Sequence, residues 1–339
     1  MAGRTCAADY QALAYHGGAL DVASRLEPHA PAPWIDLSTG VNPHAYPLPQ
    51  LAPDLWTRLP DGAALTSLEA AAARRYGAKP ETVVAGPGSQ ALIQVLARNA
   101  PRGVAAALGS TYCGHAEAFR AAGVRLLEFD SLDALAPAEV AIVVNPNNPD
   151  GRVTSRAALL DLSTRLMRGG GWLIVDEAFA DFDAADESLA PVLPEKGTVV
   201  LRSFGKAYGL AGLRLGFAVA SPDIAWMLRA ALGPWPVSGP AIAIGARALA
   251  DPDWSAAMRA RLGEEAARLD ALLEVSGWRI IGGTRLFRLA AKADADAAFR
   301  RLLSAGILTR PFAETPDRLR FGIPADEPQW ERLAAALRG

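Results

Sequence analysis

The chain has 339 residues, of which 51% are hydrophobic and 21% are charged, and its formal net charge is -2 at pH 7. This composition is typical of a globular protein with a sizeable core, and the length suggests two domains. The scattered Lys and Arg residues argue against a nucleic-acid footprint, and two cysteines and four histidines support neither a disulfide framework nor a metal site. The N-terminus lacks the apolar core of a signal peptide and no run is long enough to span a bilayer, so we expect a cytoplasmic protein with no membrane partner.

Residues 1–50 are rich in Pro, His and Ala, and we expect them to form an N-terminal arm with little regular structure. Residues 51–235 are predicted to be a large domain in which short apolar runs alternate with amphipathic helical stretches. The expected strands are Val83–Ala85, Val104–Leu108, Val140–Val144, Trp172–Val175, Val199–Leu201 and Gly216–Ala220, and the expected helices are Thr66–Tyr76, Ser89–Asn99, His115–Ala122 and Ser155–Arg168. This alternation predicts an α/β fold with a mostly parallel sheet and helices on both faces.

Residues 236–339 are predicted to be a smaller α+β domain. The segment is mainly helical to about Val275 and ends in another helix. Between these helices lie strand-like pieces at Trp278–Ile281, Arg285–Leu289 and Leu319–Ile323 and a helical pattern at Asp294–Ala305.

Three polar side chains come just after the carboxyl ends of expected strands. Asn148 lies in NPNNPDG, Asp176 opens DEAFADF, and Lys206 lies in FGKAYG. Ligands of open α/β sheets bind outside the carboxyl ends of the strands, so we expect the three side chains to converge on one crevice.

The chemistry of these side chains is complementary. A lysine amine forms an imine with an aldehyde cofactor, and pyridoxal 5'-phosphate (PLP) needs an acidic partner at its pyridine nitrogen. Lys206 and Asp176 suit these roles, and the Asn148 amide can hydrogen-bond the phenolic oxygen of the ring. Taken singly, Asp176 is more often a helix N-cap, and Lys206 a solvated loop lysine.

The segment SFGKAYGLAGLRLG favours the cofactor interpretation over a simple glycine-rich turn. Its Ser203 and Arg214 can bind a phosphate, and its glycines allow close backbone approach. GPGSQ at residues 86–90 begins an expected helix, whose N–H groups also suit phosphate, although an ordinary turn capped by Ser89 would read the same way. Tyr112 is a candidate for stacking on the cofactor ring, with core packing as the equal alternative.

Motifs across nearly the whole chain resemble fold-type-I PLP enzymes of the class I/II aminotransferase group, and within it the L-threonine-O-3-phosphate decarboxylase family. They are HGG at 16–18, DLSTGVNP at 36–43, NPNNPDG at 145–151, DEAFADF at 176–182, LRSFGKAYGLAGLRLGF at 201–217, PWPVS at 234–238 and RLRFGIP at 318–324. The resemblance implies the PLP-dependent transferase fold of the aspartate aminotransferase type, PLP as the cofactor, and a homodimer.

The resemblance also implies roles for individual residues. Lys206 is similar to the Schiff-base lysine, Asp176 to the partner of the pyridinium, and Asn148 to the residue that contacts the ring oxygen and the substrate. The positions implied for the cofactor phosphate are Ser89, Gln90, Ser203 and Arg214. The positions implied around the substrate are His16, Gly17, Gly40, Arg310 and Arg320, with Arg320 holding the α-carboxylate. Two arginines suit a substrate with a carboxylate and a phosphate, whereas composition alone would make them surface residues.

Four positions depart from the family pattern. Phe179 replaces the Tyr of DEAY, as in the decarboxylase branch, and Gly205 replaces a Ser, which removes a phosphate contact. Gly40 replaces an Asn near the substrate, and Leu59 replaces a Tyr that reaches the partner subunit's cofactor. The last two replacements leave open an altered substrate binding or a weak activity.

The resemblance implies a PLP-dependent carboxy-lyase that converts L-threonine O-3-phosphate to (R)-1-amino-2-propanol O-2-phosphate in cobalamin (vitamin B12) biosynthesis. An aminotransferase on the same scaffold, such as one acting on histidinol phosphate, is the first alternative. A non-catalytic scaffold or ligand sensor that keeps PLP or only the fold is the second alternative.

Overall fold

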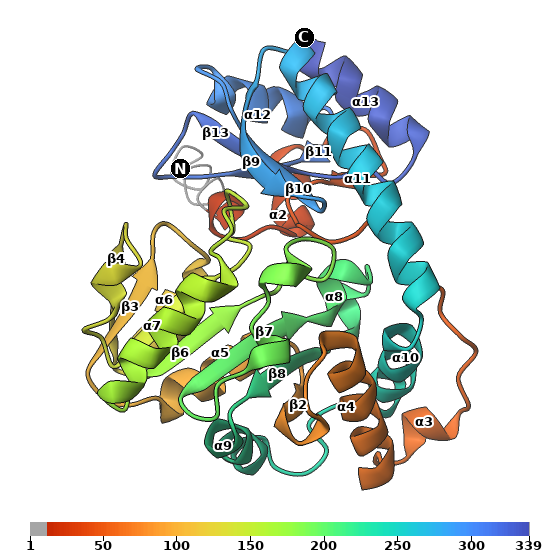
Figure 1. The fold of residues 1–339 in the computed structure, drawn as a ribbon. Helices are drawn as coiled ribbons and strands as arrows, with labels where there is room; N and C mark the ends of the chain where they lie inside the picture. Colours follow the sequence, from red (N-terminus) through yellow and green to blue (C-terminus); the bar gives the residue numbers. More distant parts are fainter. Residues whose placement is uncertain (1–11, 339) are drawn as a thin grey trace. The chain divides into compact units, whose positions relative to one another are not determined.

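The computed structural model describes residues 12–338, and the chain divides into two compact units (Figure 1). The terminal unit comprises Met1–His44 and Ala257–Gly339, and the central unit comprises Ala45–Ala256. Residues 45–50 and 236–256 therefore belong to the central unit, while the domain boundaries expected from the sequence stay a prediction. No helix within residues 12–338 is both long enough and apolar enough to cross a membrane.

The central unit is built on a seven-stranded sheet with the order β2-β8-β7-β6-β5-β3-β4. Strands β7, β6, β5, β3 and β4 run parallel, whereas β8 is antiparallel to both of its neighbours, β2 and β7. The strands are β2 (Val83–Gly86), β3 (Val104–Leu108), β4 (Arg125–Phe129), β5 (Val140–Val144), β6 (Trp172–Asp176), β7 (Thr198–Ser203) and β8 (Gly216–Ala220). This sheet confirms the expected mixed, mostly parallel α/β fold.

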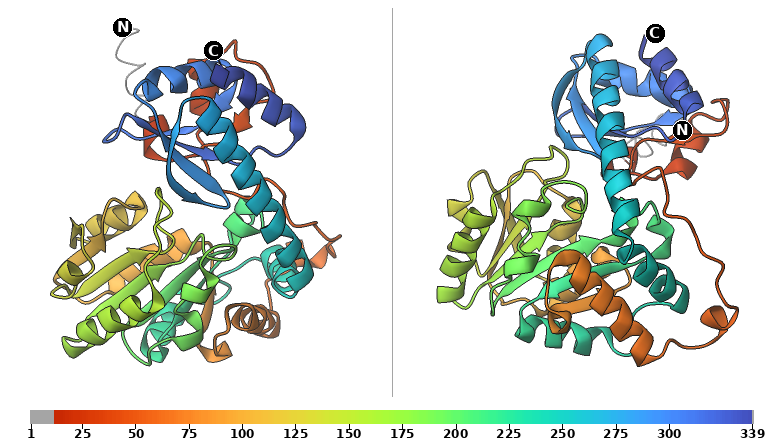
Figure 2. Two further views of the ribbon diagram at one scale, coloured as in Figure 1. Left: turned by 45° about the horizontal axis from the view of Figure 1, so that its top comes forward. Right: turned by 45° about the vertical axis from the view of Figure 1, so that its right-hand side comes forward.

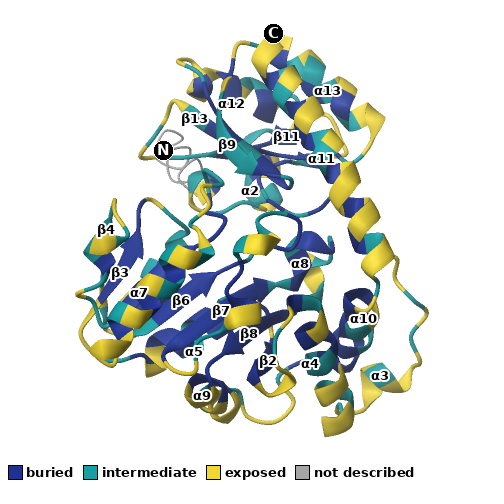
Figure 3. Ribbon diagram, in the orientation of Figure 1, coloured by how far each residue is buried: buried dark blue, intermediate teal, exposed yellow. Residues whose placement is uncertain are grey.

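Helices cover both faces of this sheet (Figure 2). They are α3 (Asp54–Thr57), α4 (Gly62–Tyr76), α5 (Ser89–Asn99), α6 (Cys113–Ala121), α7 (Arg156–Arg168), α8 (Phe204–Ala207), α9 (Pro222–Leu232) and α10 (Gly239–Leu249), while α11 (Pro252–Val275) contains the unit boundary. Alternate strand residues such as Ile142 and Val199 form one buried cluster with α5, α6 and α9. Helix α7 packs on β6, and its buried leucines lie outside that cluster. The strands other than β4 are accordingly buried along most of their length (Figure 3).

Local sequence signals explain where the helices begin and end. The Asp61 carboxylate accepts a hydrogen bond from Ala64 N at 2.7 Å and caps α4, which ends at Gly77 in the left-handed conformation (φ 67°). Ser155 caps α7 in the same way, through Ala158 N at 3.3 Å. Helix α5 begins directly after the turn that follows β2 and has no side-chain cap.

The terminal unit contains a four-stranded antiparallel sheet with the order β12-β13-β10-β9 and a parallel pair of two-residue strands, β1 and β11. Its strands are β1 (Ile35–Asp36), β9 (Arg279–Thr284), β10 (Phe287–Ala291), β11 (Ile307–Leu308), β12 (Arg310–Pro311) and β13 (Arg318–Gly322), and its helices include α2 (Leu20–Leu26), α12 (Ala295–Ser304) and α13 (Glu327–Arg338). The segment expected to be an irregular arm therefore contains α2 and β1, because β1 finds a partner in β11 far along the chain.

Candidate functional site

One edge of the seven-stranded sheet carries all the residues expected around the cofactor. Strand β2 runs in the same direction as the parallel strands, so β2, β3, β5, β6 and β7 present their carboxyl ends at the same edge. The candidate residues on or just beyond these ends are Ser89, Gln90, Tyr112, Asn148, Asp176, Ser203 and Lys206, and Arg214 precedes β8.

Asp176 is the last residue of β6 and is 3% exposed. Its Oδ2 lies 2.8 Å from His115 Nε2, and its Oδ1 accepts a hydrogen bond from Ala178 N at 3.1 Å. His115 was not predicted as a site residue, although it lies in the first turn of α6, just after the end of β3. The other ring nitrogen of His115, Nδ1, is buried without a hydrogen-bond partner among residues 12–338.

Tyr112 connects this pair to the start of α5. Its hydroxyl donates to Gln90 Oε1 at 2.9 Å, and its ring meets the His115 ring edge-on, with centroids 6.0 Å apart. A Cβ on Gly114 would lie 2.4 Å from the Tyr112 ring, so the ring position requires glycine there. Contacts thus run from Gln90 through Tyr112 and His115 to Asp176.

Two serines and an arginine meet at the N-terminus of α5. Ser203 pairs in register with Gly216, and a Cβ on Gly216 would lie 2.4 Å from Ser89 N. Arg214 has φ 54°, and its Nη2 lies 2.8 Å from the place of a Cβ on Gly88. Hydroxyls, a guanidinium and the N–H groups of a helix start together form a suitable phosphate-binding set.

Lys206 lies in the short helix α8, immediately after β7, and is half-buried. Its Nζ lies 5.4 Å from the centroid of Phe179, which follows Asp176 by three residues. A Cβ on the preceding residue, Gly205, would lie 2.7 Å from Ala211 Cα, so the backbone leaves no room for the serine of the family pattern. The absence of a side chain at residue 205 thus has a steric cause.

Asn148 is 6% exposed and follows β5. Its loop is held to the loop after β3 by Asn147, which accepts from Thr111 Oγ1 at 2.7 Å and donates to Ser110 O at 3.1 Å. The two loops that carry Asn148 and Tyr112 are therefore fixed to each other.

The residues expected around the substrate, other than Asn148, lie in the terminal unit. Arg310 on β12 and Arg320 on β13 are direct cross-strand partners and are 8% and 3% exposed. Burial, and then the charge of Arg310, hold the pKa of Arg320 well below its usual range, although Asp36 opposes this shift. Two buried guanidinium groups side by side form a strong attraction for an anion.

Ser38 organises the other residues of this group. Its carbonyl accepts from Arg320 Nη2 at 2.6 Å, and its hydroxyl accepts from Gly18 N at 2.7 Å. A Cβ on Gly17 would lie 2.4 Å from the Ser38 carbonyl oxygen, so the segment HGG packs directly on Ser38. His16 precedes this contact and is half-buried, while Gly40 is buried two residues beyond Ser38. Neither Ser38 nor its role was predicted.

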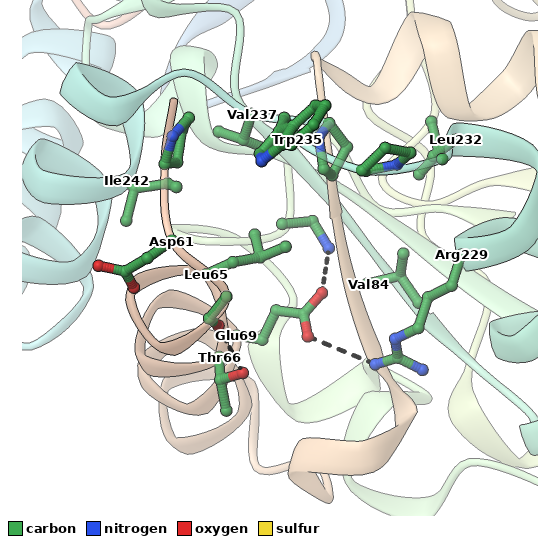
Figure 4. Close-up of a pocket in the computed structure, with 16 residues that line it drawn as sticks. Asp61, Leu65, Thr66, Glu69, Val84, Arg229, Leu232, Trp235, Val237 and Ile242 are labelled. Atoms are coloured by element: carbon green, nitrogen blue, oxygen red, sulfur yellow. Dashed lines mark hydrogen bonds and ion pairs between the residues drawn. The ribbon is translucent and has the colours of Figure 1, made fainter. Parts of the chain in front are cut away.

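A separate pocket of about 400 Å³ in the central unit contains none of the predicted residues (Figure 4). Its charged groups are Asp61 and the ion pair of Glu69 with Arg229, whose atoms are 3.4 Å apart. Glu69 also accepts from Ala85 N at 2.9 Å, and Arg229 donates to Val83 O at 2.6 Å. The ion pair therefore covers the open edge of β2, which is a structural role.

Comparison with known proteins identifies the family of the chain. Residues 32–337 match the family described as aminotransferase class I and II. A threonine-phosphate decarboxylase of Pseudomonas aeruginosa is 44% identical over 96% of this chain and 97% of its own length, and a histidinol-phosphate aminotransferase of Xanthomonas campestris is 30% identical over 84% and 86%. The crystal structure of a histidinol-phosphate aminotransferase from Sinorhizobium meliloti with pyridoxal-5'-phosphate has the same fold, with a TM-score of 0.81 and 21% identity over 94% of this chain and 93% of that one. The chain therefore belongs to the aminotransferase class I and II family.

Proposed function

We propose that the chain is a PLP-dependent decarboxylase that converts L-threonine O-3-phosphate to (R)-1-amino-2-propanol O-2-phosphate in cobalamin biosynthesis. The observation that carries the proposal is the buried cross-strand pair of Arg310 and Arg320 in a chain 44% identical to a threonine-phosphate decarboxylase. Threonine phosphate carries a carboxylate and a phosphate, and this pair of cations suits such a doubly charged molecule.

The residues at the sheet edge fit PLP. The N-terminus of α5 with Ser89, Ser203 and Arg214 offers a cradle for the phosphate, in which Gly88 leaves space for the guanidinium. Asp176 offers a buried carboxylate for the pyridine nitrogen, and Lys206 offers an amine for the aldehyde. We infer that Gln90 and Tyr112 line the same site, with Tyr112 against the ring and Asn148 at the phenolic oxygen.

The protein residues would then divide the work of the reaction. When bound, PLP supplies an electron sink for the electron pair that remains on Cα after carbon dioxide leaves. Asp176 holds the proton on the pyridine nitrogen, and His115 fixes the orientation of the Asp176 carboxylate. Lys206 Nζ supplies the proton that replaces the carboxylate on Cα.

Substrate orientation is the task of the terminal unit. Arg320 binds the carboxylate and Arg310 contributes to binding of the phosphate, with His16, Gly17 and Gly40 as further substrate positions. The Ser38 carbonyl directs the Arg320 guanidinium through the 2.6 Å hydrogen bond. This orientation selects which bond to Cα breaks and therefore separates decarboxylation from transamination.

An assay with O-phosphothreonine tests the proposal. We expect carbon dioxide release without any keto acid, and loss of that release in Lys206→Ala. A product that requires 2-oxoglutarate would instead establish the aminotransferase alternative, which the relatives at 30% identity represent. A preparation that stays colourless with PLP and is unaffected by borohydride would favour the scaffold alternative.

A homodimer is part of the same proposal. Large apolar side chains of the central unit are exposed in the single chain: Trp56 by 69%, Leu59 by 67% and Trp235 by 55%. Such side chains suit burial against a second copy. Light scattering that gives the mass of a monomer at micromolar concentration would refute it.

A further inference from the structure

A buried ion pair lies one residue away from two members of the site. Asp176 ends β6 and is followed by Glu177, while Ser203 ends β7 and is preceded by Arg202. Asp176 and Leu201 are register partners, and Glu177 N donates to Leu201 O at 2.9 Å. Neighbouring residues of a strand direct their side chains to opposite faces, so Glu177 and Arg202 lie behind the site.

Glu177 and Arg202 are buried and make several hydrogen bonds. Arg202 Nη2 lies 2.9 Å from Glu177 Oε2 and donates to Ser188 Oγ at 2.9 Å. The Ser188 hydroxyl in turn donates to Glu177 Oε2 at 2.6 Å, and Leu189 N donates to Oε1 at 3.0 Å. Glu177 is 0% exposed and Arg202 4%. Both carboxylate oxygens are therefore fixed.

Two further groups hold the guanidinium. Its Cζ lies 4.7 Å from the ring centroid of Tyr76, and its Nη1 lies 3.8 Å from Asp181 Oδ1. Burial alone would lower the pKa of Arg202, but the charges of Glu177 and Asp181 outweigh it and raise that pKa. Burial also raises the pKa of Glu177, although the charge of Arg202 opposes this shift. The Arg202 guanidinium is therefore positively charged under assay conditions and can hold Glu177 in place.

The location of the pair matters more than its strength. A buried ion pair is weak evidence for stability, because desolvation offsets much of the attraction. This one joins the carboxyl end of β6, which carries Asp176, to the carboxyl end of β7, which leads directly into α8 and Lys206. Catalysis is sensitive to displacements of the reacting groups by about 1 Å. Small displacements of these two strand ends would therefore affect the reaction more than displacements elsewhere in the strands.

We propose that Arg202 and Glu177 are positioning residues, which keep the Asp176 carboxylate and the Lys206 amine at a fixed separation without touching the substrate. The inference rests on the proposed function, since it assigns the two groups to one cofactor. Ser188 belongs to the same device, because its hydroxyl bridges the guanidinium and the carboxylate.

Three variants and one matched control test this inference in the PLP-loaded enzyme. Glu177→Gln removes the negative charge, and Arg202→Lys keeps the positive charge but loses the planar, forked guanidinium. Ser188→Ala removes the bridging hydroxyl while both charges stay in place. Glu69→Gln is the control, because Glu69 is also bonded to an arginine and a backbone N–H of the same unit.

We expect the pKa of the Lys206 imine, read from absorbance against pH, to shift by about half a unit or more in Glu177→Gln. We also expect kcat to fall about tenfold while KM changes less than about twofold, with Ser188→Ala and Arg202→Lys showing smaller effects in the same direction. In the protein without cofactor, amide exchange at Glu177 should be faster in these variants. Glu69→Gln should change none of these readouts, whatever its effect on the thermal midpoint.

The inference would be overturned if the variants lowered the thermal midpoint but kept the imine pKa and the kcat of the wild type. A wild-type protein that forms the imine but releases no carbon dioxide from phosphothreonine would overturn the proposed reaction alone, because the imine pKa still reports the positioning. A wild-type protein that never forms an imine would overturn both.

Discussion

His115 Nε2 lies 2.8 Å from Asp176 Oδ2, and the two residues are 1% and 3% exposed. The second carboxylate oxygen accepts from Ala178 N at 3.1 Å, so the carboxylate is held at both ends. A buried carboxylate that is fixed in this way offers one defined direction to a protonated ring nitrogen. Under the proposed function, the pair would take part in the chemistry of the site as well as in its packing.

Replacing Asp176 tests the charge of the carboxylate, and replacing His115 tests its orientation. Asp176→Asn keeps the size but cannot stabilise a protonated pyridine, and we expect carbon dioxide release to fall about 10³-fold. His115→Gln can still donate a hydrogen bond, so we expect a loss of about tenfold. Initial rates with saturating PLP measure both effects.

His44→Gln is the control for this pair. His44 Nε2 lies 2.8 Å from a Glu265 carboxylate oxygen, so His44 is also paired with a carboxylate. Neither His44 nor Glu265 is a predicted site residue. Equal losses in His44→Gln and His115→Gln would contradict the special place of His115.

Gly205 provides a test of the steric argument. Gly205→Ser would restore the serine of the family pattern, but its Cβ would lie 2.7 Å from Ala211 Cα, a backbone atom that cannot move easily. We expect a loss of about 1–3 kcal/mol in the free energy of unfolding and weaker PLP binding. Gly212→Ser is the control, because a Cβ there meets nothing within 4 Å. A Gly205→Ser protein that binds PLP more tightly would contradict the argument and favour a lost phosphate contact.

Much of the central sheet could be predicted because its strands are continuous apolar runs. The runs Val104–Leu108, Val140–Val144 and Gly216–Ala220 have the bounds expected from the sequence, and so has the helix Ser89–Asn99. Strand β4 was not predicted, because it mixes charged residues such as Arg125 and Glu128 with apolar ones and none of its residues is buried. The other edge strand, β2, is a buried apolar run and was predicted, so the rule depends on burial and not on the place of a strand in the sheet.

Some residues of the candidate site could also be predicted from the sequence, and others could not. Residues at the end of a strand or shortly after it, such as Asp176 and Lys206, could be chosen because their chemistry and their place in the sheet both suit a ligand site. His115 could not, because its contact with Asp176 depends on the order β6-β5-β3, which no local pattern reveals. The register that sets Arg310 opposite Arg320 is equally non-local, so the sequence showed two arginines but not a pair.

The buried Tyr208 side chain should lower the free energy of unfolding at high pH. Burial and then the charge of Asp181 raise its pKa from 10.0 to about 12, although contacts with Ser255 and Arg75 oppose this shift. The folded protein keeps the phenolic proton where the unfolded chain loses it, so stability must fall as the pH rises from 10 to about 12. Two pKa units correspond to about 3 kcal/mol.

Tyr208→Phe should remove that loss. The hydroxyl is buried and has no hydrogen bond of normal geometry with residues 12–338, because Ser255 and Arg75 only approach it, so the variant should cost little near pH 7. Urea unfolding at pH 7 and at pH 11 measures the difference. The same decline in both proteins between these pH values would show that other groups control alkaline unfolding.

Arg310 should contribute chiefly to substrate binding. Arg310→Gln removes one of two buried cross-strand cations, so we expect KM for phosphothreonine to rise about 100-fold. Inorganic phosphate should raise the thermal midpoint of the wild type more than that of the variant. Arg318→Gln is the control, because Arg318 lies on the strand of Arg320 but is half-exposed beside Asp317, and it should show neither change. An unchanged KM in Arg310→Gln would contradict a contact between Arg310 and the substrate.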